Sequence, residues 1–83
     1  KSAPVYAVYP IPVKKDIKAL LNPEVKQAEF VISSTVGEQV MKATVTPDKN
    51  NVATLDLAKL HPGTYKLTVH TSKGKYTQMF IKR

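Results

Sequence analysis

The feature that most constrains the fold is a series of short segments in which apolar and polar side chains alternate. In the clearest of them, residues 64–71, apolar side chains occupy every second position and polar ones the positions between: Tyr65, Leu67 and Val69 against Lys66, Thr68 and His70. Alternation with a period of two is typical of a β-strand that buries one face. Similar segments recur about every ten residues between turn signals of Pro, Gly and Asn, which indicates an all-β protein.

The segments predict about seven short strands and no helix of ordinary length. The strands are expected at residues 5–9, 17–21, 27–34, 38–46, 52–57 and 64–71, with the last one after a turn at residues 72–74. Periodicity alone would also allow a helical turn at residues 17–21, where we favour a strand, and another at residues 56–60. The pattern predicts an antiparallel immunoglobulin-like β-sandwich, with a small Greek-key barrel as the alternative.

The alternation also predicts which side chains face the core. Two sets should be buried: Ala28, Phe30 and Ile32, and Ala53, Leu55 and Leu57. In the final hairpin, a three-residue loop at residues 72–74 would set Leu67 opposite Met79. Tyr65 would then lie opposite Ile81, and this is the register that we favour.

The alternative for this hairpin is a two-residue loop over Lys73 and Gly74. It would turn Tyr76 and Phe80 toward the core, because a slip of one residue exchanges the two faces of a strand.

Composition limits the function as well. The chain has 83 residues and no cysteine, so we expect one domain over residues 1–83 without disulfides or thiolate metal sites. Its formal net charge of +7 would either attract anionic surfaces such as nucleic acid or lipopolysaccharide, or only keep a lysine-rich surface solvated, and we favour the second interpretation. No apolar run reaches the length of a membrane span. A chain that starts at Lys1 rather than methionine suggests a piece of a longer protein.

No group of residues has the pattern of a catalytic, metal or cofactor site. The two histidines, His61 and His70, lack the paired spacing of a metal site. The three glycines, Gly37, Gly63 and Gly74, stand apart at expected turns and cannot form a glycine-rich phosphate loop. We therefore predict a protein that is not an enzyme, carries no cofactor and does not bind nucleic acid.

Three stretches in order resemble one family, the C-terminal sorting domains of the type IX (Por) secretion system. Residues 8–16 (VYPIPVKKD) are similar to its opening Tyr-Pro-Asn-Pro segment, with Ile11 where the family usually has asparagine. Residues 31–40 (VISSTVGEQV) resemble its central strand-glycine-strand segment, and residues 60–83 its closing strands. At matching positions the resemblance implies these recognition residues: Pro10, Pro12, Gly37, Gly63, Tyr65, Ile81, Lys82 and Arg83.

The resemblance also implies a function. It suggests a non-enzymatic signal domain at the end of a longer secreted protein, read by the type IX translocon as cargo passes from the periplasm across the outer membrane to the cell surface or beyond. In such families a sortase-like peptidase commonly removes the domain and the cargo is joined to anionic lipopolysaccharide, although some members retain the domain. The alternative is an immunoglobulin-like adhesion or carbohydrate-binding module of a secreted protein.

Two further expectations concern the surface. Phe80 and Ile81 should be held in or beside the last strand, with Lys82 and Arg83 beyond it in solvent, where the basic pair would be either a docking handle or only an aid to solubility. Deleting the pair should then leave the fold nearly as stable. Edge strands of an open sandwich also expose unpaired backbone groups, which predicts an edge-strand homodimer.

Overall fold

The computed structural model describes residues 3–9 and 13–83. Seven strands follow one another along the chain: β1 (Val5–Tyr9), β2 (Asp16–Leu21), β3 (Ala28–Ser34), β4 (Gln39–Val45), β5 (Val52–Asp56), β6 (Gly63–Thr71) and β7 (Gly74–Lys82). Every predicted strand is present. At residues 57–60 the Leu60 N–H donates to the Leu57 carbonyl over 2.9 Å, forming a single turn rather than a helix. Within the described ranges, no helix is long and apolar enough to cross a membrane.

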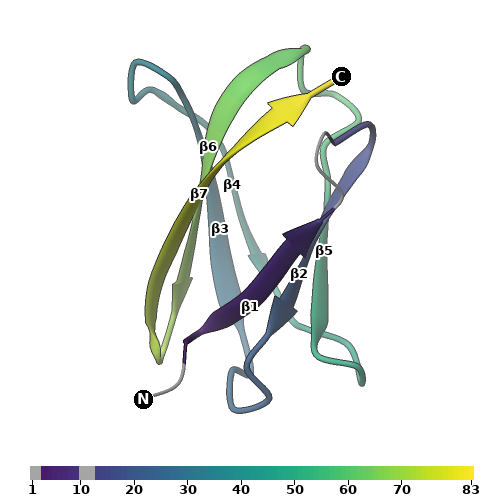
Figure 1. Cartoon of the computed structure of the whole chain (residues 1–83), viewed down its shortest axis with the longest axis vertical. Coiled ribbons are helices and arrows are strands. Elements are labelled where there is room, and N and C mark those ends of the chain that lie inside the picture. Colours follow the sequence, from purple (N-terminus) through teal and green to yellow (C-terminus); the bar gives the residue numbers. More distant parts are fainter. Residues whose placement is uncertain (1–2, 10–12) are drawn as a thin grey trace.

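The strands form two sheets that pack face to face (Figure 1). One sheet has the order β1-β2-β5 and the other the order β4-β3-β6-β7, with antiparallel neighbours throughout. This confirms the predicted β-sandwich and favours it over the barrel. β4 pairs with β3, whereas constant-type immunoglobulin domains place their fourth strand beside the fifth.

The core lies between the two sheets, and the side chains predicted to fill it are buried. Each of the six from β3, β5 and the residue after β5 is at most 8% exposed: Ala28, Phe30, Ile32, Ala53, Leu55 and Leu57. Leu67 and Val69 of β6 are fully buried as well, beside their β3 partners Ile32 and Phe30, as the alternation in residues 64–71 predicted.

The loop of the β6–β7 hairpin is shorter than the one that we favoured. Thr71 pairs with Gly74, so the loop holds only Ser72 and Lys73. The Thr71 hydroxyl accepts a hydrogen bond from the Lys73 N–H over 3.1 Å and donates one to the Gly74 carbonyl over 2.9 Å. Gly74, with a φ of 137°, is the first residue of β7 and not part of the loop.

The favoured register is therefore wrong. The alternative loop over Lys73 and Gly74 is also displaced by one residue, although it predicts the observed faces of β7. Tyr65 lies opposite Phe80, which is 2% exposed, whereas Met79 and Ile81 are each 50% exposed. Tyr76 is half-buried against the core on the same face as Phe80. The physical reason is that an aromatic side chain buries more apolar area than methionine or isoleucine at the same place, so the register that hides Phe80 prevails.

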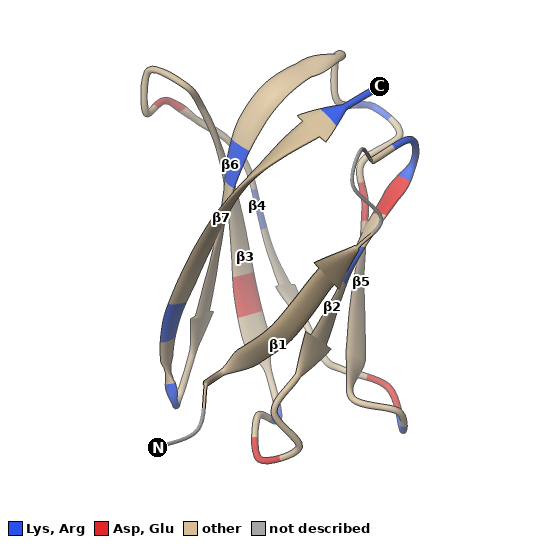
Figure 2. Cartoon of the chain, in the orientation of Figure 1, with Lys and Arg blue, Asp and Glu red and all other residues tan. Residues whose placement is uncertain are grey.

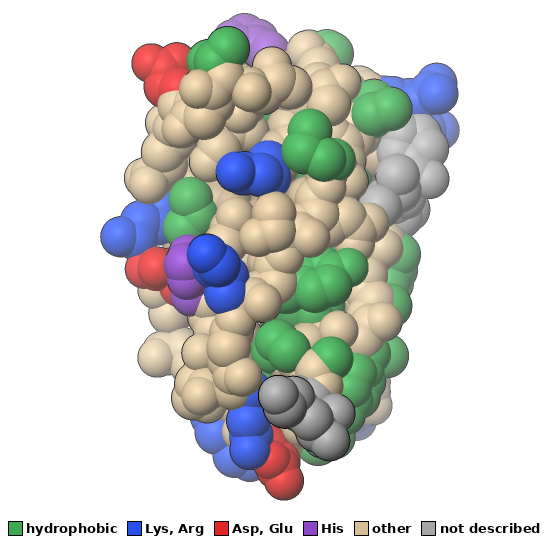
Figure 3. Space-filling view, turned by 60° about the vertical axis from the view of Figure 1, so that its left-hand side comes forward, with side chains coloured by type: hydrophobic (Ala, Val, Ile, Leu, Met, Phe, Trp, Pro, Cys, Tyr) green, Lys and Arg blue, Asp and Glu red, His purple; other side chains and the backbone are tan. Residues whose placement is uncertain are grey.

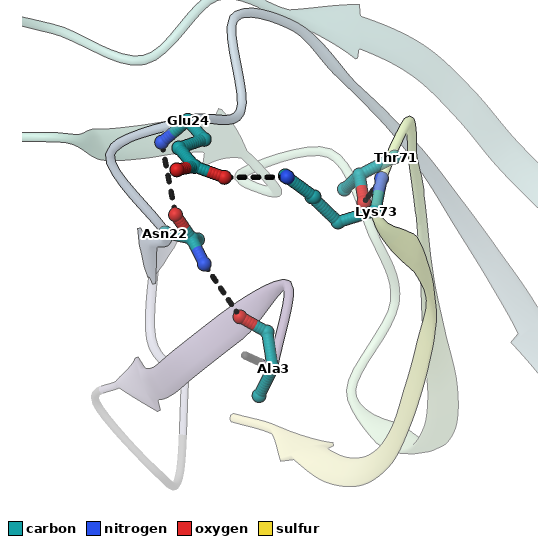
Figure 4. A network of polar contacts seen from close by, with 5 residues as sticks. All are labelled: Ala3, Asn22, Glu24, Thr71 and Lys73. Carbon is teal, nitrogen blue, oxygen red and sulfur yellow. Dashed lines mark hydrogen bonds and ion pairs between the residues drawn. The ribbon is translucent and has the colours of Figure 1, made fainter. Parts of the chain in front are cut away.

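The end of the sandwich near the N-terminus is closed by a polar network (Figure 4). The buried Asn22 amide donates to the Ala3 carbonyl over 3.2 Å, and its side-chain oxygen accepts from the Glu24 N–H over 2.9 Å. Glu24 in turn forms an ion pair with Lys73 of the β6–β7 loop. The hydrogen bond from Lys73, followed by its positive charge, lowers the pKa of the Glu24 carboxyl. The C-terminus lies at the opposite end of the molecule (Figure 1).

Candidate recognition site

Most of the predicted recognition residues that the structure describes meet where β6 begins and β7 ends. Gly63 pairs with Lys82, and Tyr65 pairs with Phe80. The chain terminus lies beside them at the same end of the sandwich (Figure 1). We call the following group the terminal corner: Val13, Gly63, Tyr65, Phe80, Ile81, Lys82 and Arg83.

Tyr65 holds the terminal corner together from β6. Its hydroxyl donates to the His61 carbonyl over 2.7 Å, and its ring stacks on Phe80 with centroids 5.8 Å apart and planes inclined by 29°. Such a bond from a tyrosine near the start of the sixth strand back to the preceding turn is a tyrosine corner, known from other β-sandwiches. The ring also covers Gly63, because a Cβ there would lie 3.7 Å from it. The Gly-x-Tyr pattern thus shapes the entry into β6.

Lys82 is not the solvated residue that the sequence suggested. It is the last residue of β7, faces inward and is 5% exposed, and its Nζ donates to the Arg83 carbonyl over 2.9 Å. A lysine can be buried in this way because its apolar stem packs inside while its ammonium reaches a polar partner at the edge. Arg83 is exposed, as expected, so the two basic residues differ in environment.

Val13 pairs with this end of β7 along the edge that faces away from β6. Its N–H donates to the Ile81 carbonyl over 2.8 Å, and its carbonyl accepts from the Arg83 N–H over 2.7 Å. These two bonds form a parallel bridge with Lys82, and Val13 is completely buried. This role of Val13 was not predicted from the sequence, since the only signal was an apolar residue before a polar stretch. Pro10 and Pro12, which precede Val13, lie outside the described residues.

Gly37 lies apart from the terminal corner. It belongs to the turn between β3 and β4, at the same end of the sandwich but across the sheet from β7 (Figure 1). Its N–H donates to the Ser34 carbonyl over 2.9 Å, and its φ of 91° is a conformation that side-chain-bearing residues rarely adopt. This geometry explains the glycine by the turn itself.

Basic and acidic residues are mixed near the terminal corner (Figure 2). The Lys15 carbonyl accepts from the Leu57 N–H over 2.7 Å, which brings the Lys14-Lys15 pair close to the turn that carries Lys59. Asp16 and Asp56 are direct partners across β2 and β5 at this end. The lysines therefore have carboxylates nearby and do not form an isolated cationic site.

Two other surface features lie away from the terminal corner. An open depression of about 520 Å³ lies on the outer face of the four-stranded sheet, and polar side chains of Glu29, Thr44 and His70 line it. Tyr6 and Tyr9 on β1 are 54% and 39% exposed. Neither feature contains a residue of the terminal corner. Within the described ranges, no cluster of three or more His, Asp or Glu residues could hold a metal ion.

Comparison with known proteins decides the family. The sequence pattern described as "secretion system C-terminal sorting domain" matches residues 7–83. The chain belongs to this family, the type IX (Por) sorting domains. Its members are C-terminal signals for type IX secretion, so the sorting domain serves export to the cell surface or the extracellular space. No curated protein sequence matches it significantly.

The fold of the sorting domain also occurs elsewhere. The crystal structure of CopC from Methylosinus trichosporium OB3b is similar to it with a TM-score of 0.62, over 94% of this chain and 88% of CopC. The two sequences are 20% identical, so the likeness concerns the fold alone.

Proposed function

We propose that residues 1–83 are a single, non-enzymatic signal domain at the C-terminal end of a longer secreted protein, and that the type IX translocon recognises it as a folded unit. The observation that carries this proposal is the family match over residues 7–83, which spans both sheets. The assembled terminal corner supports it, since five of the eight motif residues lie together there: Gly63, Tyr65, Ile81, Lys82 and Arg83.

The motif residues divide into two roles. Gly63, Tyr65 and Lys82 build the terminal corner through pairing, stacking and burial. Ile81 is 50% exposed, and Arg83 is exposed as well, so these two side chains are available to a receptor. A rigidly held pair loses little entropy on docking. We assign recognition to Ile81 and Arg83, together with the motif prolines Pro10 and Pro12, and a turn-forming role to Gly37.

The later steps are part of the same proposal, and the resemblance to the family supports them. The domain and its cargo pass from the periplasm across the outer membrane, a sortase-like peptidase removes the domain, and the cargo is joined to anionic lipopolysaccharide. The corresponding products are a shortened exported protein and a protein of heterogeneous, raised mass. Both products should be absent from a strain that lacks the peptidase.

The direct test is export of a neutral reporter. Residues 1–83 are fused behind a reporter with a periplasmic secretion signal, in a strain with a working type IX system and in one without a translocon. The reporter should reach the surface or medium in the first strain only. Periplasmic retention in both strains, with the domain folded, would refute the sorting function.

Matched variants separate folding from recognition. Ile81→Asp and Arg83→Glu change exposed side chains, should keep the denaturation midpoint and should reduce export. Thr44→Glu, an equally exposed change on β4, should leave export unaffected. Equal export of all three variants would remove Ile81 and Arg83 from the recognition surface.

A further inference from the structure

The outer edge of β7 differs from the other three sheet edges. β1 has five residues and an irregular register between Val5 and Ala7, and β5 has five residues. β4 has an irregular register opposite Ile32 and Ser33. β7 is nine residues long and pairs with β6 without any shift of register. Short length, bulges, prolines and lysines are features by which proteins keep edges from pairing with other chains, and of these β7 has only the lysines Lys75 and Lys82.

The backbone groups left open on this edge can be identified. The Ile81 carbonyl accepts from Val13, so residue 81 directs its backbone groups away from β6. Because these groups alternate sides along an antiparallel strand, Lys75, Thr77 and Met79 also direct theirs outward. No described residue outside β6 pairs with residues 75–79. The N–H and C=O groups of Lys75, Thr77 and Met79 are thus regularly spaced and without a backbone partner among the described residues, on the N-terminal side of the residues of β7 that Val13 pairs with.

The charge around this edge is predominantly positive, with Glu24 paired to Lys73 just before the start of β7. Residues 57–83 contain six basic side chains and no Asp or Glu: Lys59, Lys66, Lys73, Lys75, Lys82 and Arg83. Lys75 lies on β7, and Lys66 is the cross-strand neighbour of Met79. Figure 3 shows this side of the molecule with exposed apolar patches and with acidic side chains only toward the margins of the view. A second copy would bring the same positive charge to the edge, whereas an acidic segment would be attracted.

We propose that residues 75–79 of β7 form a strand-addition site for an extended, acidic segment of a partner protein. The partner's strand would continue the β4-β3-β6-β7 sheet through the backbone groups of Lys75, Thr77 and Met79. Its outward side chains would include an acid beside Lys75. Its inward side chains would be apolar, because they would extend the cover over the half-buried Tyr76. The strand-addition site itself does not depend on the proposed sorting function. The sorting function bears only on the identity of the partner, which would then be a component of the translocon.

The purified domain tests strand addition directly. The probes are two synthetic peptides, Thr-Val-Glu-Val-Thr-Val-Glu and the same sequence with lysine in place of glutamate. Amide hydrogen exchange is followed by NMR for each residue of β7. With the acidic peptide, exchange at residues 75, 77 and 79 should slow by about tenfold or more, while residues 76 and 78, already bonded to β6, change little. The basic peptide should have no effect.

A pair of threonine variants provides the control. Thr77→Pro removes an outward N–H without breaking a bond to β6. On the opposite edge, the Ser34 N–H points to the β4 side, so the alternation leaves the N–H of Thr44 outward as well. Thr77→Pro should weaken binding of the acidic peptide by about tenfold, and Thr44→Pro by less than about twofold. If Thr77→Pro does not fold, Lys75→Glu, an exposed change, should abolish the preference for the acidic peptide.

Several outcomes would overturn the proposal. The first is amide exchange that slows uniformly along β7, or not at all, when the acidic peptide is added. The second is equal slowing at residues 42 and 44 of β4. The third is a molecular mass in light scattering that rises with concentration, which would indicate that β7 pairs with a second copy. In cells, export that fails for Thr77→Pro but not for Thr44→Pro would connect the edge to the translocon. If the unchanged reporter fusion is not exported, the sorting function fails, and the peptide experiment still decides on the edge.

Discussion

Deleting Lys82 and Arg83 should destabilise the domain and not merely remove two surface charges. The deletion removes the 2.7 Å bond from the Arg83 N–H to the Val13 carbonyl, the backbone pairing of Lys82 with Gly63, and the buried stem of Lys82. Each hydrogen bond contributes about 0.5–1.5 kcal/mol, and each buried methylene about 0.8 kcal/mol before the loss of side-chain entropy. We therefore expect a loss of about 2–4 kcal/mol.

A loss of this size is large for so small a domain. At about 0.05–0.15 kcal/mol per residue the total stability is about 4–12 kcal/mol, so the deletion would remove a substantial part of it. The melting temperature should fall by about 10–25 °C, since each kcal/mol corresponds to about 4–8 °C for a domain of this length. Urea denaturation followed by far-ultraviolet circular dichroism should show a lower midpoint at an unchanged slope.

Point variants show which part of the terminal dipeptide matters. Arg83→Ala keeps the backbone N–H that bonds to Val13 and changes an exposed side chain, so stability should stay within about 0.5 kcal/mol. Lys82→Ala should cost about 1–2 kcal/mol, because it removes the buried stem but leaves the strand pairing. A midpoint for the deletion equal to that of the unchanged domain would refute the assigned role of Lys82 and Val13 in closing the terminal corner.

Two further predictions concern the two ends of the sandwich. Tyr65→Phe should lower the free energy of unfolding by about 0.5–1.5 kcal/mol through the lost bond to His61, and Tyr65→Ala by about 2–4 kcal/mol because the half-buried ring and its stacking on Phe80 are lost as well. Tyr6→Phe, at an exposed side chain of β1, is the control, and equal melting temperatures for Tyr65→Phe and the unchanged domain would contradict the tyrosine corner. At the other end, the ion pair with Lys73 lowers the pKa of Glu24. The contribution of this ion pair to folding stability should therefore be present above about pH 4.3 and disappear as the pH falls through the lowered pKa. The denaturation midpoints of the unchanged domain and of Glu24→Gln should converge in acid, and a difference that grows in acid would contradict the ion pair.

The strands could be predicted from the sequence because each one carries its own alternation and its own turn signals. Phe30 and Leu55 lie in segments with one clearly apolar face, so local pattern and burial agree. In β7 the pattern is ambiguous, because Tyr76 and Phe80 are apolar on one face and Met79 and Ile81 on the other. Only the partner strand and the core decide which face is buried, and neither is visible in the local sequence.

The burial of Lys82 could not be predicted from the sequence, because it also depends on residues distant in the chain. Its burial depends on Val13, from the far end of the chain, and on the parallel bridge between the two residues. The alternation of apolar and polar residues in a single segment does not predict such a bridge. A terminal Lys-Arg pair is ordinarily solvated, so the prediction followed the common case. The grouping of Gly63, Tyr65 and the last three residues was anticipated only through the family motif. The geometry that joins them, a tyrosine corner and a bridged terminus, required the structure.

The position of the motif residues affects how export experiments should be interpreted. Gly63, Tyr65 and Lys82 are needed to build the terminal corner, so a variant at any of them changes stability and recognition together. Loss of export in such a variant would be explained equally well by degradation of an unfolded domain in the periplasm. Ile81 and Arg83 are different, because their backbone groups hold the corner while their side chains point outward. Substitutions there change the surface and keep the scaffold, so they can show whether the translocon reads a side chain or only requires a folded sandwich.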